Sequence, residues 1–547
     1  MPAGRTGRTR ALLAAALALV VFAVTMWARA PVGAGVYYDD GVYLALGRSL
    51  AEGEGYRYAN LPGSVPGVKY PPLFPVVLAA GWKLFGPYPG SLPALKAVNA
   101  ALWGGAAAAT FLLFAVGGGR RLVAMTAVTV FGFLSVPALS IATVLLSEPL
   151  FLLLAASALL ASLRAHKGRP AIAGGEAPGE AGLPAATLAA GALAAAAFLT
   201  RSIGIAAAAA VACAALAAGA GHRPAGGRLR GVALALLFPA LAAVGWFAWT
   251  AAAGGGVPRI AAGQYGAYAG WYLDGIGDDL AGRIRLIAGS AWPVFLSTLE
   301  VVWIPEAPPW AGRVVVLLLG ALAVLGGRSA FRRNPALPLF VLFYLALVAV
   351  WPYEPDRFFW TIHPFLTLLA AEGVAEAIPT LRADLPRLGV PAAAVGLTFI
   401  AINTARYELR GYARRAWELP QQAPAAAFAP LVAWIRENTP AEAIVASRLD
   451  PFVYWETGRL AVPSWQFLPT DYGRYERDPA TLAAGLEAIR EAFRPDYVAV
   501  LRGDNKPYLT AAAYAEAYPD RIELAYGGAG EGEPGVVYRL LSPPNPP

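Results

Sequence analysis

The stretch ALLAAALALVVFAVTMWARAPVGAGVYYDDG, residues 11–41, places two adjacent carboxylates soon after a long apolar run. Residues 11–27 carry no charge and approach the roughly 20 apolar residues that a helix needs to cross a bilayer. The basic start and the Ala28–Ala30 sequence are also features of a secretory signal peptide. The apolar run is longer than is usual for such peptides, and more apolar segments follow it. We therefore favour an uncleaved first membrane helix over a signal peptide.

The composition indicates a membrane protein. Of the 547 residues, 57% are hydrophobic and 14% are charged, and the mean hydropathy is +0.52. Soluble domains have roughly a quarter of their residues charged. In a multispanning protein a net charge of +8 indicates basic cytoplasmic loops, so we expect membrane lipid and no nucleic acid as a partner. The single cysteine, Cys213, excludes an internal disulfide, and three histidines exclude a His-rich metal centre.

Apolar segments predict a mostly α polytopic membrane protein with about 11–13 transmembrane helices. The segment 72–86 is short and interrupted by proline, which favours a re-entrant or interfacial helix. The eleven clearer segments lie near 11–29, 95–117, 121–137, 140–163, 185–200, 203–220, 230–253, 312–327, 336–352, 359–378 and 389–405.

Basic residues fall in alternate loops. With the N-terminus in the cytoplasm, every basic loop lies on the cytoplasmic side, as the positive-inside rule requires. We therefore expect a multi-pass protein of the plasma (inner) membrane with external loops 30–94 and 254–311. The basic segments are Arg5–Arg10, Arg120–Arg121, 164–169, 222–230, 326–334 and 381–387.

The chain changes character near residue 417. An amphipathic helix around AFAPLVAWIREN and the helical segment 479–493 alternate with β-type runs at 443–447, 496–501, 521–526 and 535–540. This alternation predicts an extracytoplasmic α/β domain over 417–547, following a membrane domain over 1–410 with its external loops.

Three carboxylates are candidates for chemistry because an ionisable residue at membrane depth is costly. One of Asp39 and Asp40 suits an N-cap of the helix that follows, and the pair also suits a general base or a cation site. Glu148 is expected about one turn inside an apolar helix, where it needs an arginine, a cation or a proton. If a divalent cation binds, these three residues are its candidate ligands.

Three cations are expected on the same face of the membrane. Lys69 stands before Pro71-Pro72, where it either reaches an anion or extends towards lipid headgroups. Arg201 lies in a turn between two spans, and Arg357 begins another span; either suits phosphate recognition or a boundary anchor. Further candidates for contact with an acceptor or a cation are Tyr70, Asp356 and His363.

Several segments together resemble the GT-C superfamily of membrane glycosyltransferases, especially protein mannosyltransferases that use dolichyl-phosphate mannose and lipid A aminoarabinose transferases. The matching pieces are the acidic pair at 39–40, KYPPLFPVVLAAGWKLFG, LLSEPLFLLL, LTRSIGIA, DRFFWTIHPFLTLL and 434–459. Lys-Tyr-Pro-Pro departs from the Lys-Pro-Pro of aminoarabinose transferases, so that substrate is not assumed.

The resemblance implies a hexosyl- or pentosyltransferase that uses a polyprenyl-phosphate sugar at the outer face of the membrane. It assigns a base to Asp39 or Asp40, and to Glu148 the binding of an acceptor, a cation or an arginine. Lys69, Arg201 and Arg357 would receive the lipid-phosphate leaving group. The acceptor would be a hydroxyl of a glycan, lipid or protein. The alternative is a lipid or solute transporter or flippase, against which the absence of a repeated half stands.

Overall fold

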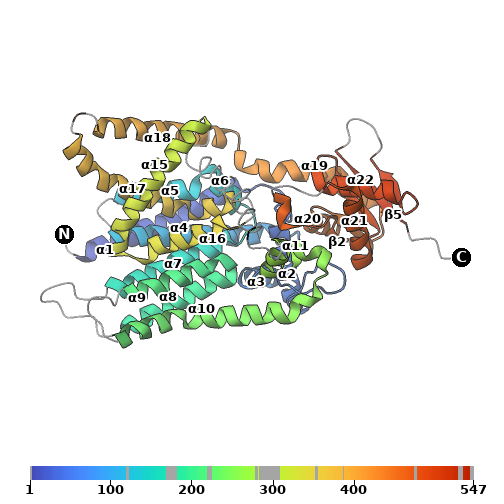
Figure 1. Cartoon of the computed structure of the whole chain (residues 1–547), viewed down its shortest axis with the longest axis horizontal. Helices are drawn as coiled ribbons and strands as arrows, with labels where there is room; N and C mark the ends of the chain where they lie inside the picture. The colour runs from blue at the N-terminus through green and yellow to red at the C-terminus, as the bar shows by residue number, and fades with distance from the viewer. Residues whose placement is uncertain are drawn as a thin grey trace.

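The structure is a computed structural model. It describes residues 3–118, 122–167, 182–217, 225–276, 281, 308–351, 355–385, 387, 389–472, 477–527 and 534–541. Helices form an elongated bundle with the N-terminus at one end, and a smaller α/β unit lies at the other end (Figure 1). The second half of the predicted external loop 254–311 lies largely outside the described residues, as do Arg120 and Arg121.

Six helices of the described residues are long and apolar enough to cross a membrane, and the chain is therefore a multi-pass membrane protein. They are α1 (Ala3–Ala28), α4 (Leu92–Gly118), α7 (Glu148–Lys167), α10 (Ala225–Ala253), α15 (Pro309–Arg333) and α17 (Asp356–Asp384). Shorter apolar helices are α3 (Leu73–Phe85), α8 (Gly182–Thr200), α9 (Ile205–Ala217, preceded by η1 at Ser202–Gly204) and α16 (Ala336–Ala349).

A bent pair of helices interrupts the predicted spans 121–137 and 140–163. Helix α5 (Leu122–Leu134) and helix α6 (Val136–Ala142) meet at an angle of 58° next to Pro137, which cannot donate a helical hydrogen bond. Helix α7 begins only at Glu148. The expectation that Glu148 lies one turn inside a helix is therefore wrong. The following Pro149 fits the first turn of a helix, where its missing N–H costs nothing.

Small residues allow the long helices to pack closely. Gly326 of α15 and Gly373 of α17 each lie against the backbone of the facing helix, so a Cβ at either position would overlap a carbonyl group. Close approach of this kind is typical of helix pairs in membranes. The last helix of the bundle, α18 (Gly389–Ala413), leads through the turn η5 (Ala416–Glu418) to the α/β unit.

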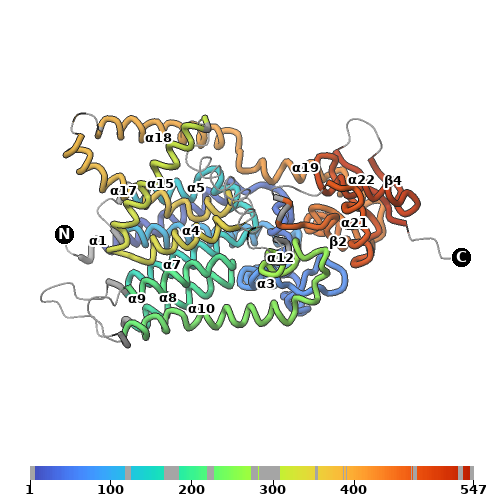
Figure 2. Tube along the Cα trace, viewed as in Figure 1, coloured from blue at the N-terminus to red at the C-terminus, as the bar shows by residue number. Residues whose placement is uncertain are grey.

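Two segments cover the end of the bundle that faces the α/β unit. Helix α2 (Asp39–Glu52) and α3 belong to the predicted loop 30–94, and α3 is a helix of 13 residues with exposed Leu84 and Phe85. The second segment holds η2 (Gly254–Gly256), η3 (Arg259–Ala261), α11 (Ala262–Tyr265) and α12 (Tyr268–Ile276). Figure 2 shows α12 near the junction with the α/β unit, where it packs against η6 (Pro469–Tyr472).

The α/β unit contains a five-stranded mixed sheet with the strand order β2-β1-β3-β5-β4. The predicted strands and the helix α21 are confirmed, whereas β2, α20 and α22 were not predicted. The strands are β1 (Ile444–Ser447), β2 (Leu460–Pro463), β3 (Tyr497–Leu501), β4 (Ile522–Tyr526) and β5 (Gly535–Leu540). The other elements are α19 (Leu419–Asn438), α20 (Asp450–Thr457), η6 (Pro469–Tyr472), α21 (Pro479–Phe493) and α22 (Asn505–Ala517).

Candidate functional site

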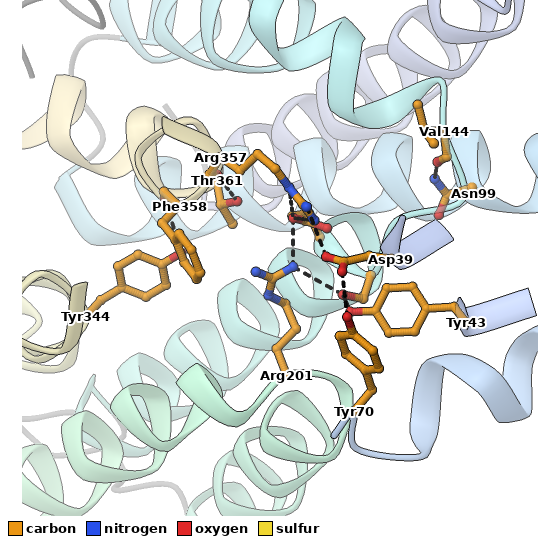
Figure 3. A network of polar contacts seen from close by, with 12 residues as sticks. Asp39, Tyr43, Tyr70, Asn99, Val144, Arg201, Tyr344, Arg357, Phe358 and Thr361 are labelled. Carbon is orange, nitrogen blue, oxygen red and sulfur yellow. Dashed lines mark hydrogen bonds and ion pairs between the residues drawn. The ribbon is translucent and has the colours of Figure 1, made fainter. Parts of the chain in front are cut away.

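Arg357 joins two acidic residues that come from distant parts of the chain. Its Nη1 donates to Asp39 Oδ2 at 3.0 Å (Figure 3), and its Nη2 donates to Glu148 Oε1 at 2.7 Å. The Arg357 Nε lies 3.1 Å from the same Glu148 oxygen. The guanidinium is thus shared between a fully buried carboxylate and the Asp39 carboxylate, whose side chain is 25% exposed. Charge-assisted bonds of this kind fix geometry strongly.

Arg201 adds a second cation to the same carboxylate. Its Nη1 lies 2.7 Å from Glu148 Oε1 and 3.2 Å from the Ser147 hydroxyl. The Tyr43 hydroxyl is 3.0 Å from that of Ser147 and ties helix α2 to the start of α7. Two guanidiniums therefore lie side by side around one buried glutamate, and each has donors left to bind another anion.

Three helix starts bring these residues together. Asp39 is the first residue of α2, Glu148 the first of α7 and Arg357 the second of α17. Acidic side chains in the first turn are favoured by the positive end of the helix dipole. Asn99 of α4 holds the loop before α7, because its amide donates to the carbonyl of Val144 at 2.6 Å. The site is therefore lined by the N-terminal ends of three helices.

Asp39 and Asp40 have different surroundings. Asp39 points to Arg357 and also accepts a hydrogen bond of 2.6 Å from the Tyr70 hydroxyl. Asp40 is 1% exposed, and its two oxygens accept from the backbone N–H groups of Gly35 and Tyr37. Burial raises the pKa of Asp40 to about 6. Neither is the N-cap: that position is Tyr38, and both carboxylates lie inside the first turn of the helix.

Lys69 is buried beside the cluster. Its Nζ donates to the carbonyl of Gly263 at 2.7 Å and lies 5.2 Å from the centre of the Tyr268 ring and 5.7 Å from that of Tyr70. Burial lowers the pKa of Lys69 to about 8, and the negative charge of Asp39 opposes that shift. The lysine is therefore still mainly cationic at neutral pH, and it adds a third positive group to the site.

The structure brings Asp39, Glu148, Arg201, Arg357 and Tyr70 together, with Lys69 next to them. Other predicted site residues lie outside this contact network. Asp40 holds a turn, and Asp356 is exposed at the first position of α17. His363 is 1% exposed between the rings of Phe131 and Trp360, inside the helix bundle. The hydrogen bonds of Tyr43 and Ser147 at the site are not predicted, because nothing in the sequence marks these two residues apart from their closeness to Asp39 and Glu148.

The described residues show no preformed site for a divalent cation. Among the described residues, no three His, Cys, Asp or Glu side chains are grouped as metal ligands would be. The predicted ligands are separated, since Asp40 turns away and two guanidiniums already bind Glu148.

Comparisons with known proteins give fold relatives only. No protein-family model matches the sequence, and no curated protein matches it. Among solved structures, apo ArnT, the lipid A aminoarabinose transferase of Cupriavidus metallidurans, matches at 15% identity with a TM-score of 0.53. The match covers 99% of this chain and 100% of that one. ArnT has also been solved bound to undecaprenyl phosphate, a match with a TM-score of 0.46.

A second fold relative is an enzyme of a different kind. The apo oligosaccharyltransferase of Archaeoglobus fulgidus matches at 14% identity with a TM-score of 0.50, over 92% of this chain and 71% of that one. Both proteins are members of the GT-C superfamily. The chain, matched over nearly its whole length by both, therefore has the fold of the GT-C membrane glycosyltransferases.

Proposed function

We propose that the chain is a glycosyltransferase that moves a hexose or pentose from a polyprenyl-phosphate donor to an acceptor hydroxyl. The observation that carries this proposal is the Asp39–Arg357–Glu148–Arg201 cluster at one end of an apolar helix bundle. It combines a partly exposed carboxylate, which can act as a base for the acceptor hydroxyl, with fixed positive charge, which can stabilise the leaving phosphate. The fold supports the same conclusion, because ArnT and the oligosaccharyltransferase share it.

In the proposed reaction, the acceptor oxygen forms a bond to the anomeric carbon of the sugar. The bond between that carbon and the phosphate oxygen breaks, and the lipid phosphate leaves with the electron pair. Asp39 takes the proton of the acceptor hydroxyl, since an alcohol is a poor nucleophile without a base. Preorganised cations that stabilise charge at the leaving group lower the barrier to such a step.

The charge balance of the site favours an anionic ligand. Arg201, Arg357 and Lys69 contribute three positive charges, and Asp39 and Glu148 contribute two negative ones. We assign to Glu148 the holding of the two arginines, since its Oε1 accepts from both. The remaining guanidinium donors can then bind phosphate oxygens in a fixed geometry.

The membrane orientation is part of the proposal. The site lies at the end of the bundle next to the α/β unit, and the N-terminus lies at the opposite end (Figure 1). With the N-terminus cytoplasmic, as the basic loops indicate, the site opens at the outer face and the α/β unit over 417–547 is extracytoplasmic. The membrane domain then spans 1–410. The acceptor is a glycan, lipid or protein of that compartment.

The test is a transfer assay with the purified full chain. A radiolabelled polyprenyl-phosphate hexose or pentose is supplied with a crude envelope fraction as the acceptor. We expect labelled product and released polyprenyl phosphate from the native protein, and neither from Asp39→Asn. Asp478→Asn, an exposed helix cap in the α/β unit, is the matched control and should keep full activity. Flux of lipid or solute without consumption of any lipid-phosphate sugar would establish the transporter instead.

A further inference from the structure

The backbone immediately before Asp39 has an unusual conformation. Tyr38 has φ 65° and ψ −67°, and the N–H of Asp39 donates to the carbonyl of Tyr37 at 2.7 Å. This is a γ-turn of the rare kind with positive φ, which is strained for a bulky residue. Such strain persists only where surrounding contacts hold it. The orientation of the Asp39 carboxylate, the proposed base, therefore depends on the contacts that hold Tyr38 in this conformation.

The ring of Tyr38 packs against Tyr265 of the short helix α11. The two ring centres are 6.1 Å apart, and the buried Tyr38 hydroxyl has no hydrogen-bond partner among the described residues. Asp450 is the first residue of α20 and is fully buried. Its Oδ2 accepts hydrogen bonds from the Tyr265 hydroxyl and, at 3.4 Å, from the Asn60 amide.

The rest of α20 packs against the same turn. The backbone of Gly35, at φ 100°, lies so close to Phe452 that a Cβ there would be 2.5 Å from the Phe452 nitrogen. The Trp455 indole donates to the carbonyl of Gly41, in the first turn of α2, at 2.9 Å. Helix α20 is thus fixed to the segment that carries the two aspartates.

A second chain of hydrogen bonds leads from Asp450 towards the other partner of Asp39. The Tyr58 hydroxyl donates to the carbonyl of Tyr265 at 2.9 Å and accepts from the backbone N–H of Lys69 at 3.2 Å. The next residue, Tyr70, donates to Asp39. Asp450 is therefore linked through Tyr265 to Tyr38, which precedes Asp39 in the chain. Through Tyr265 and Tyr58 it is also linked to the segment of Tyr70, whose hydroxyl binds the Asp39 side chain.

We propose that Asp450 of the α/β unit is a positioning residue for Asp39, acting through Tyr38 and Tyr265. The inference rests on the proposed function, because the turnover that it concerns is sugar transfer. Because reacting groups must be placed to within a fraction of an ångström, loosening the turn lowers the rate of the chemical step. Asp450 makes no direct contact with Arg201 or Arg357, which are proposed to bind the donor phosphate, so we expect donor affinity to change less than the rate.

The first test compares steady-state kinetics of Asp450→Asn and Tyr265→Phe in the full chain, since the Tyr265 hydroxyl donates to Asp450. We expect kcat to fall by about tenfold or more, while KM for the donor stays within about twofold of the native value. Asp504→Asn is the matched control: Asp504 is also a buried carboxylate of the α/β unit, paired with Arg448. This control should keep the native kcat. Equal losses in Asp450→Asn and Asp504→Asn would overturn the proposal, and so would a rise in KM alone.

A second readout needs no activity. Carbodiimide labelling of Asp39, quantified by mass spectrometry, should be faster in Asp450→Asn than in the native chain or in Asp504→Asn, since a released carboxylate is more accessible. Unchanged labelling in a folded Asp450→Asn protein would refute the positioning role. A native chain that transfers no sugar but shows this difference in labelling would refute only the proposed function.

Discussion

The guanidinium of Arg357 donates to Asp39 Oδ2 across 3.0 Å, although the two residues are 318 positions apart in the chain. Asp39 begins helix α2, and Arg357 lies in the first turn of α17. The two residues form an ion pair near the membrane boundary, where an unpaired charge is costly. The same contact orients the carboxylate that we propose as the base.

The two adjacent aspartates should differ in their mutant phenotypes. Asp39→Asn keeps the size of the side chain but removes the base, so kcat should fall by about 10²–10⁴-fold with little change in melting temperature. The measurement is the transfer assay, paired with thermal unfolding in the same detergent. A native rate for Asp39→Asn would contradict the assignment.

Asp40 is expected to matter for stability. Asp40→Ala leaves the N–H groups of Gly35 and Tyr37 without their acceptor, at about 1–3 kcal/mol for the buried Gly35 group and less for the half-buried Tyr37 group. The melting temperature should therefore drop, while Asp40→Asn, which keeps an accepting oxygen, should lose less. A melting temperature of Asp40→Ala equal to the native value would show that these bonds contribute nothing.

Glu148→Gln should weaken donor binding. The change removes the charge that holds Arg201 and Arg357 side by side, so both guanidiniums lose their fixed position and KM for the donor should rise about tenfold or more. Glu372→Gln is the control, because Glu372 pairs with Arg333 elsewhere in the bundle. If both variants raise KM equally, the effect is one of general stability and not of the phosphate site.

Donor capture should depend on pH through Lys69. Its pKa is lowered to about 8, so the ammonium is charged below that pH and becomes neutral as the pH rises through it. Since kcat/KM reports the free enzyme, it should decline above about pH 8. In Lys69→Met the decline should be absent and kcat/KM should be low throughout. Lys83→Met, at an exposed position of α3, should keep the native profile.

Gly35 and Gly53 offer a matched pair at positive φ. At Gly53, φ is 84° and no atom lies within 4 Å of an added Cβ, so Gly53→Ala should cost about 1 kcal/mol from backbone strain alone. Gly35→Ala adds an overlap with the backbone of Phe452 and should lower the melting temperature much more. Similar melting temperatures for the two variants would show that α20 is not tightly packed there.

Local sequence patterns predicted most of the architecture. Apolar runs of bilayer length marked the membrane helices, and alternation with turn residues marked α21 and four of the five strands of the sheet. The break at Ser135–Ser147 escaped prediction because its residues are as apolar as the helices around it. Proline at 137 and 149 was the local signal for that break.

The sequence by itself determined the class of protein, the approximate positions of most helices and the residue types available for chemistry, because hydropathy and charge are local properties. Only the tertiary structure decided which charges meet: Asp39 with Arg357, but Asp40 with its own backbone turn. It also brought Asp450, which looks like an ordinary helix start in the sequence, against Tyr265, whose ring packs on Tyr38. Contacts between residues hundreds of positions apart arise from helix packing, and no local pattern encodes them.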